Sequence, residues 1–543
     1  MIRRNLYMKS LFKVNGKPFF SIGGQVNNSS SSNAEVMKVA FATTKGLGLN
    51  TIAAPVHWEL FEPIEWQFDY SQVKMLIEGA RATGLKLVIL WFGAWKNGNS
   101  HYVPSWVKLN KDRFLWAKAA DGVEIRSLSP ISEETRLADE KAFVALCKFI
   151  AENNADETVI GVQVENEPGL IGSPRDYSPV ANALFNAPVP EEVATFAGKA
   201  GTWEEVFGFY GAEYFSAYHF VKYIDGVTAK GKEVLDLPMY INVWLGEMYS
   251  HIPGTNYPSG GAATRVYPLW KRFAKHIDAI APDIYLSDYQ TCEDLFKTYS
   301  SLDNTFYLPE SMPTPQAIIN SMRAVAEYGL CGIHFFGIDM FAALTNPAFK
   351  DMLGAMGDNP MMKQLLPMVG EITGSIKILA SSKHLIEEYQ GTGKLYAVGQ
   401  YEGQANGYID FGDYIGSIRF LNPTGLALGA GGDTNMDNRH MAAAYPNYRA
   451  KGFIVYKGNG EFYLTGDAYR LMLYPKFNIV ETTSAVHAGD FLNQRSQGYV
   501  SVTEGFFTDD GTYVPTIIRN GDEYDYGLWV TNDIGVLHVQ MDR

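Results

Sequence analysis

The feature that most constrains the fold is a regular alternation of short apolar runs with longer amphipathic stretches over the first two thirds of the chain. Each apolar run has the length of one strand, and the stretches between runs carry apolar residues at helical spacing. Parallel strands need connections of this length. The expected strands are residues 18–25, 50–56, 86–92, 159–166, 239–244, 279–285, 305–310 and 332–338, and the clearest helices are 35–46, 70–83, 139–153, 203–231 and 314–328.

Eight such alternations predict an α/β fold, a (β/α)8 TIM barrel. A doubly wound open sheet would show the same periodicity. The barrel is favoured because polar residues gather at the carboxyl ends of the expected strands, where such barrels carry their chemistry. A stretch rich in Pro, Gly and Ala, residues 170–202, follows the fourth strand, and we expect a long loop there that forms a wall of the substrate cleft.

Beyond residue 384 the pattern changes to short alternating runs separated by Gly-Asn, Asn-Gly and Asp-Gly pairs. Such pairs are typical of hairpin turns, so this region is expected to be all-β and sandwich-like. A chain of 543 residues is also too long for one ordinary core. We therefore predict two domains, a catalytic barrel at 1–382 and a C-terminal β-sandwich domain at 383–543.

Charge and cysteine content exclude several classes of function. The formal net charge is −14, so the chain has no basic field for nucleic acid or an anionic membrane. Three scattered cysteines fit neither a disulfide framework nor a metal site. Lysines interrupt the N-terminal segment before an apolar core could form, so no secretory signal is expected and the protein is predicted to be cytoplasmic. No cofactor and no metal are expected.

The strongest local motif is IGVQVENEPG, at residues 160–169. On a strand, Gln163, Glu165 and Glu167 share one face. Polar side chains inside a barrel are costly to bury without partners, so we expect Glu165 to pair with a buried cation. Glu167 comes last, at the mouth of the barrel, where it can act as an acid or a base.

A second motif, FYLPESM at residues 306–312, places Glu310 at the end of the seventh expected strand. A single glutamate at a strand end is more often a solvated or ion-paired residue. Two carboxylates on the fourth and seventh strands, however, face each other across a barrel. This is the arrangement of a retaining glycosidase, whose carboxyl groups lie about 5–5.5 Å apart.

The pairing of QVENEPG with LPES resembles glycoside hydrolase clan A, and most of all the β-galactosidases of families 35 and 42 or a small related family. The segment HWELFEP…FDY, residues 57–70, is similar to the segment after the second strand in both families. GLKLVILWFGAWKN and VPSWVK resemble the third strand and the following loop of bacterial family 35 members that carry an extra C-terminal β domain.

This resemblance implies that Glu167 is the general acid/base and Glu310 the nucleophile. It also implies that Asn166 binds the sugar 2-hydroxyl group and that Tyr285 orients the nucleophile. One departure concerns the sugar: family 35 enzymes carry a Cys-Ala-Glu segment that helps to hold galactose, and residues 93–97 read GAWKN instead. The choice between galactose and glucose therefore stays open. The zinc-binding cysteine cluster frequent in family 42 does not occur in the sequence.

The resemblance implies a retaining, exo-acting β-galactosidase that hydrolyses terminal β-D-galactosides, with a homo-oligomeric assembly. A β-glucosidase or another clan A β-glycosidase is the alternative. A non-catalytic carbohydrate-binding protein is less favoured, because a degenerate barrel would normally have lost one of the carboxylates. Further polar and aromatic residues at strand ends are candidates for the sugar-binding subsite: Gln25, Asn28, Trp58, Glu59, Trp95, Asn97, Asn242, Trp244, Phe336 and Asp339.

Overall fold

The structure is a computed structural model that describes residues 10–342, 360–420, 449–476 and 498–542, apart from 249, 302, 313, 402, 403, 405, 525 and 526. Its internal contacts divide the chain into two compact units. One, the barrel unit, consists of Ser10–Met312 and Cys331–Ala343, and the other, the β unit, of Met1–Lys9, Pro313–Leu330 and Leu344–Arg543.

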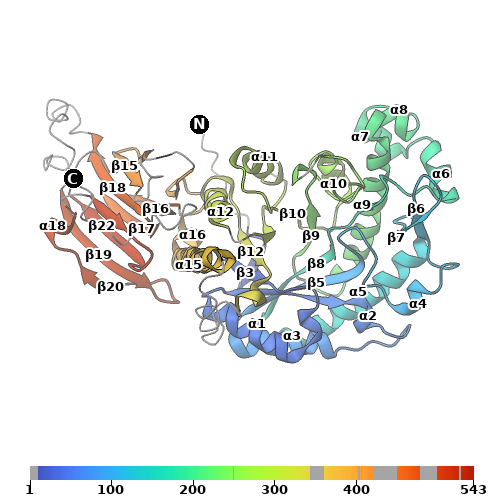
Figure 1. Cartoon of the computed structure of the whole chain (residues 1–543), viewed down its shortest axis with the longest axis horizontal. Coiled ribbons are helices and arrows are strands. Elements are labelled where there is room, and N and C mark those ends of the chain that lie inside the picture. Colours follow the sequence, from blue (N-terminus) through green and yellow to red (C-terminus); the bar gives the residue numbers. More distant parts are fainter. Residues whose placement is uncertain are drawn as a thin grey trace. The chain divides into compact units, whose positions relative to one another are not determined.

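Eight parallel strands form the sheet of the barrel unit (Figure 1). The ring closes where Ile284 and Ser311 form a parallel bridge, and the N–H group of Ile284 donates to the carbonyl of Glu310 at 3.0 Å. The predicted barrel is therefore confirmed, and the open sheet is wrong. In spatial order the strands are β10 (Ala279–Asp283), β9 (Met239–Trp244), β8 (Val159–Asn166), β5 (Lys86–Lys96), β4 (Thr51–His57), β3 (Ser21–Gln25), β12 (Gly332–Phe336) and β11 (Leu308–Ser311).

Helices follow these strands and begin and end at residues that suit helix termini. Asn33 accepts hydrogen bonds from the first N–H groups of the first helix, and Gly84 and Gly329 end two others in the left-handed conformation. The main helices are α1 (Ala34–Gly46), α3 (Ser71–Thr83), α5 (Glu133–Asn153), α9 (Gly211–Lys232), α10 (Tyr267–Phe273), α11 (Tyr289–Tyr299) and α12 (Pro315–Tyr328).

An N-terminal hairpin fills one part of the barrel interior. Strand β1 (Phe12–Val14) pairs with β2 (Lys17–Phe19), and the fully buried Phe12 ring meets Tyr307 edge-on at 5.2 Å. A Cβ atom at Gly161 would lie 2.5 Å from the Phe12 ring, so only glycine fits there. Apolar side chains from the strands complete this cluster, among them Val88, Leu90, Phe92, Tyr240 and Ala281.

The region expected to be a long loop after β8 contains helices instead. Helix α6 (Pro179–Asn186) begins after Ser178, whose side chain accepts from the N–H group of Ala181, and proline occupies its first turn. Helix α7 (Glu191–Ala197) follows. The alanines of this stretch favour helix formation and outweigh its prolines and glycines.

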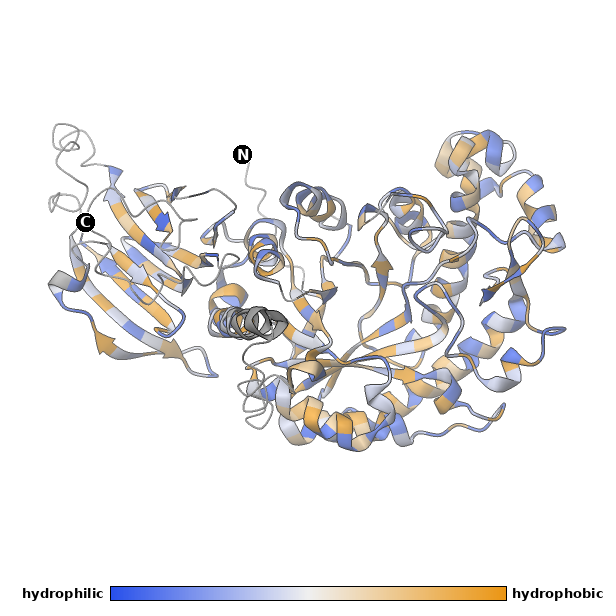
Figure 2. Cartoon of the chain, in the orientation of Figure 1, coloured by the Kyte–Doolittle hydropathy of each residue, from blue (hydrophilic) through white to orange (hydrophobic). Residues whose placement is uncertain are grey.

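The β unit contains two antiparallel sheets that share a core of buried apolar residues, including Phe462, Leu464, Leu471 and Leu473. Hydrophobic and hydrophilic residues both occur along its strands (Figure 2). Burial alternates along Tyr414–Phe420, as expected when one face of a strand is buried, whereas the first six residues of Lys451–Gly458 are all buried. The all-β C-terminal prediction is confirmed. One sheet has the order β13 (Leu395–Gly399), β16 (Lys451–Gly458), β17 (Glu461–Asp467), β22 (Val536–Met541), β19 (Tyr499–Phe507), β20 (Tyr513–Ile518), and the other β14 (Asn406–Asp410), β15 (Tyr414–Phe420), β18 (Tyr469–Pro475), β21 (Leu528–Val530).

Helix α12 follows the seventh strand of the barrel in chain order, but its contacts assign it to the β unit. It packs against β13, where a Cβ atom at Gly399 would lie 2.6 Å from Ile319. Gln390, after helix α16 (Lys383–Tyr389), donates to the carbonyls of Val325 and Leu330 at 2.9 and 2.7 Å. Helix α15 (Pro360–Ser381) also belongs to this unit, whereas the predicted boundary at residues 382/383 assigns it to the barrel. Among the described residues, no helix is both long and apolar enough to cross a membrane.

Candidate active site

Glu167 follows directly after β8, at the carboxyl end of the barrel, and is buried. Its backbone is left-handed, with φ of 45°, a conformation that costs a non-glycine residue roughly 1–3 kcal/mol. Two bonds hold it there: its N–H group donates to Asn242 Oδ1 at 2.7 Å, and its carbonyl accepts from the N–H group of Gly98 at 3.1 Å. Neighbouring strands therefore fix the direction of the Glu167 side chain.

Glu310, on β11, is buried and accepts hydrogen bonds on both carboxylate oxygens. Gln25 Nε2 donates to Oε1 at 2.7 Å, and Asn166 Nδ2 donates to the same oxygen at 3.4 Å. Tyr285 OH donates to Oε2 at 2.7 Å. Donors from three other strand ends therefore fix the orientation of this carboxylate.

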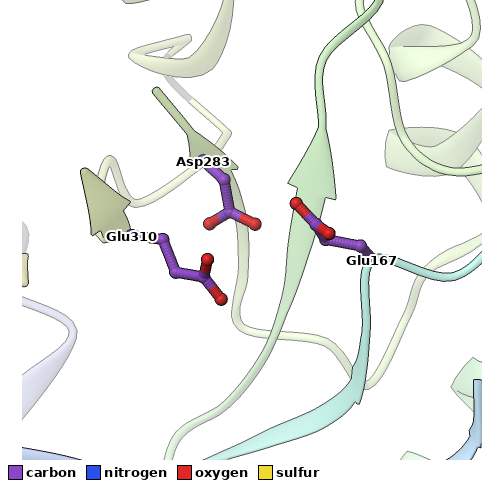
Figure 3. A group of neighbouring side chains, drawn as sticks. All are labelled: Glu167, Asp283 and Glu310. Carbon is purple, nitrogen blue, oxygen red and sulfur yellow. The ribbon is translucent and has the colours of Figure 1, made fainter. Parts of the chain in front are cut away.

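A third carboxyl group, that of Asp283 at the end of β10, completes the site. One side-chain oxygen each of Glu167, Asp283 and Glu310 lies within 4.8 Å of the other two. Figure 3 shows the three side chains converging from three strand ends. Asn242 links two of them, because its Nδ2 donates to Asp283 Oδ2 at 2.7 Å while its Oδ1 holds the backbone of Glu167.

Burial and crowding of negative charge control the protonation of this site. Burial and the neighbouring Glu310 raise the pKa of Glu167 to about 7, although Lys96 opposes the shift. Burial, Glu310 and Glu167 raise the pKa of Asp283 well above its usual value. Near neutral pH the site therefore retains protons on carboxyl groups, which is the property that a general acid needs.

Sequence reasoning missed Asp283 and Lys96. Both signals were present. Asp283 ends its strand and lies two residues before Tyr285. Lys96 follows Trp95 directly on β5, so the side chains of Lys96 and Trp95 must point to opposite faces of the sheet. Lys96 takes the interior face, where its Nζ lies 5.2 Å from the centre of the Phe92 ring.

The structure brings several predicted subsite residues to the mouth of the barrel. Gln25 and Asn166 contact Glu310, and Phe336 lies beside Gln25 in the register of β12 with β3. The N–H group of Asn97 donates to the carbonyl of Asn166 at 3.1 Å. Trp244 ends β9 half-buried, and its indole N–H has no partner among the described residues.

Two predicted subsite tryptophans are not available to a sugar, which corrects the prediction. Trp58 has no exposed surface, and its Nε1 donates to Glu62 at 3.0 Å. Trp95 is equally buried, and its ring packs against Tyr223 of α9. The reason is strand alternation, which turns Trp95 toward the helix layer. Other candidates make contacts within the protein: Glu59 with Lys108, the carbonyl of Asn28 with His57, and Asp339 with Asn27 and Ser30.

The expected cation beside Glu165 is also wrong. Glu165, fully buried, accepts from the N–H groups of Ala94 and Trp95 at 3.2 and 2.7 Å, and its side chain hydrogen-bonds to the buried carboxyl group of Asp139. Asp139 in turn accepts from Trp91 Nε1 at 2.8 Å. Two buried carboxyl groups in contact must share a proton, which replaces the expected positive charge.

Comparison with known proteins gives one family match and one curated relative. Residues 372–531 match a family described as a domain of unknown function (DUF5597). A β-galactosidase of Xanthomonas manihotis is 28% identical over 184 residues, which are 32% of this chain and 28% of that enzyme. The match thus spans less than a third of the curated relative's length.

Solved structures with a similar fold include three glycoside hydrolases. The catalytic domain of a β-amylase from Paenibacillus polymyxa is 14% identical, with a TM-score of 0.44 over 60% of this chain and 94% of that one. A β-galactosidase from Bacillus circulans sp. alkalophilus is 14% identical, with a TM-score of 0.41 over 58% and 50%. A catalytic mutant of a GH42 β-galactosidase from G. stearothermophilus is 15% identical, with a TM-score of 0.42 over 60% and 52%. The expected resemblance to a β-galactosidase is thus found in sequence over 184 residues, and the C-terminal part of the chain matches a separate domain family.

Proposed function

We propose that the protein is a retaining β-glycosidase, with Glu310 as nucleophile and Glu167 as general acid/base. The observation that carries the proposal is the separation of the two carboxyl groups, whose nearest oxygens lie within 4.8 Å. Retaining glycosidases place these groups about 5–5.5 Å apart, whereas inverting enzymes need about 6.5–9.5 Å to admit a water molecule.

The hydrogen bonds of the site support this division of roles. In the first step Glu310 attacks the anomeric carbon, while Glu167 gives its proton to the leaving oxygen. In the second step Glu167 removes a proton from water, which attacks the anomeric carbon and releases Glu310. The pKa of Glu167, raised to about 7, suits a group that must both donate and accept. Tyr285 and Gln25 hold the attacking carboxylate in place.

A terminal β-D-galactoside is the proposed substrate. The likeness to a curated β-galactosidase supports galactose. Buried acceptors at the site, Gln25 Oε1 and Asn166 Oδ1, have no partner among the described residues and can accept from sugar hydroxyl groups. A β-glucoside is the second candidate, because GAWKN replaces the Cys-Ala-Glu segment and brings Lys96 to the site.

Azide rescue of two alanine variants tests the roles separately. Glu310→Ala should lose turnover, and azide should restore it by attacking from the nucleophile's side to give the α-glycosyl azide. Glu167→Ala, assayed with a dinitrophenyl β-galactoside that needs no protonation, should accumulate glycosyl-enzyme and give the β-glycosyl azide. An active Glu310→Ala enzyme without azide, or the same azide anomer from both variants, contradicts the assignment. Rates on 4-nitrophenyl β-galactoside and β-glucoside decide the sugar.

A further inference from the structure

The carboxyl group of Asp283 has no role in the mechanism above, yet it lies inside the site. It is buried, with 1% of its surface exposed. Asn242 donates to its Oδ2, and its Oδ1 has no N–H or O–H donor among the described residues. A buried carboxylate oxygen without a donor is costly, so this oxygen needs a proton or a neighbour that carries one.

Glu167 is that neighbour. The two carboxyl groups have oxygens within 4.8 Å of each other, and a carboxyl group can donate to another only when one of them is protonated. Asn242 fixes the pair, because its amide binds Asp283 at one end and the backbone of Glu167 at the other. We propose that Glu167 and Asp283 share one proton, and that Asp283 is a positioning residue that keeps this proton available to the acid/base.

The proposal rests on the proposed function. The total negative charge of Glu310, Glu167 and Asp283 stays the same through that reaction. In the free enzyme Glu310 carries one negative charge, and the Glu167–Asp283 pair carries another. When Glu310 bonds to the anomeric carbon it becomes a neutral ester, the bond from that carbon to the leaving oxygen breaks, and the proton of the pair passes to that oxygen. The pair is then doubly ionised, but the charge of Glu310 is gone. Water returns the proton in the second step, so the total charge of the three groups stays constant.

Charged and titratable groups face the pair from several strands. Lys96 on β5 lowers the pKa of both carboxyl groups, and Glu310 on β11 raises it. Burial raises the pKa of four tyrosines near the pair, Tyr285, Tyr240, Tyr299 and Tyr307, and the charge of Asp283 adds to each shift. The pKa of Asp283 nevertheless remains raised, because burial and two neighbouring carboxylates outweigh one lysine.

The first test is the pH dependence of kcat/KM for Asp283→Asn with 4-nitrophenyl β-galactoside. Asparagine keeps the size and the contact to Asn242 but cannot hold the shared proton. The last proton of the site should then leave at lower pH. The basic limb of the kcat/KM profile should therefore shift by about one to two pH units to lower pH, the size expected when one of two charges at this separation is removed. A matched control is Asp176→Asn, a buried aspartate that accepts from Ser129 and Ser178 away from the carboxyl cluster. Its basic limb should stay in place.

A second test does not depend on catalysis. The carboxyl carbon of Glu167 in wild-type protein, labelled with ¹³C-glutamate and assigned with Glu167→Gln, should titrate in two steps in the NMR spectrum. In Asp283→Asn it should titrate in one. A single step in the wild type, or an unmoved basic limb in a folded Asp283→Asn enzyme, overturns the shared proton. If two steps are seen but no glycoside is hydrolysed, the proposed function falls and the shared proton stands.

Discussion

The hydroxyl group of Tyr285 offers a quantitative test of the nucleophile. Tyr285→Phe keeps the ring and removes the donor that lies 2.7 Å from Glu310 Oε2. A hydrogen bond to a charged group contributes about 1.5–3 kcal/mol. At about 1.4 kcal/mol per tenfold change in rate, kcat/KM should fall roughly 10- to 150-fold. The loss should not be larger, because Gln25 and Asn166 still hold the other oxygen.

The assay is initial-rate hydrolysis of 4-nitrophenyl β-galactoside, with thermal unfolding measured on the same samples. The change should appear mainly in kcat, because the hydroxyl group contacts the nucleophile. Tyr267→Phe is the control: this buried hydroxyl bonds to Ser301 at 2.7 Å, away from the carboxyl groups, and its loss should leave kcat/KM within about twofold. A folded Tyr285→Phe enzyme with wild-type kcat, or a loss confined to KM, would refute the role of Tyr285.

Three further outcomes are expected. Lys96→Met should shift the basic limb of the pH–rate profile to higher pH, the opposite of Asp283→Asn, because Lys96 lowers the pKa of Glu167. A limb that stays in place or shifts to lower pH contradicts this. Burial lowers the pKa of His334 to about 3, so only the unfolded chain binds that proton between pH 6.5 and 3. Stability to urea should therefore decline as pH falls below 6.5, by up to about 1.4 kcal/mol per pH unit more than in His334→Gln, and equal slopes would refute it. Gly23→Ala should lower Tm by several degrees, since its Cβ would lie 2.3 Å from the His334 ring; an unchanged Tm would show that the ring can move.

Local pattern was sufficient to predict the framework of the fold. All eight barrel strands lie at the expected places, because a buried parallel strand is a short apolar run bounded by turn residues. The stretch after β8 was harder, since Pro179 opens a helix there although proline often marks a loop. The Ser178 side chain, which caps the first turn, decides in favour of the helix over the loop.

The candidate site was predictable in part. Glu167 and Glu310 follow from motif and strand position, because parallel strands present their carboxyl ends on one side of a barrel. Asp283 was missed although its place at a strand end is visible in the sequence, because that place does not give its distance to the other carboxylates. Trp95 was misplaced because an aromatic residue at a strand end suggests a sugar platform, whereas its place in the alternation of β5 turns it to the helix layer. Contacts between strands distant in sequence decide such details.

The packing of α12 on β13 has a consequence for shortening the chain. Removing everything after residue 382 would delete the strand that covers Ile319. It would also delete the Gln390 side chain, which binds one carbonyl in the last turn of α12 and one just after the helix. The remaining helix would carry an uncovered apolar face and unpaired backbone groups at its end. A sequence-based cut between the two domains should therefore give an aggregation-prone fragment, and exchange of the C-terminal domain between relatives should succeed only when α12 is exchanged with it.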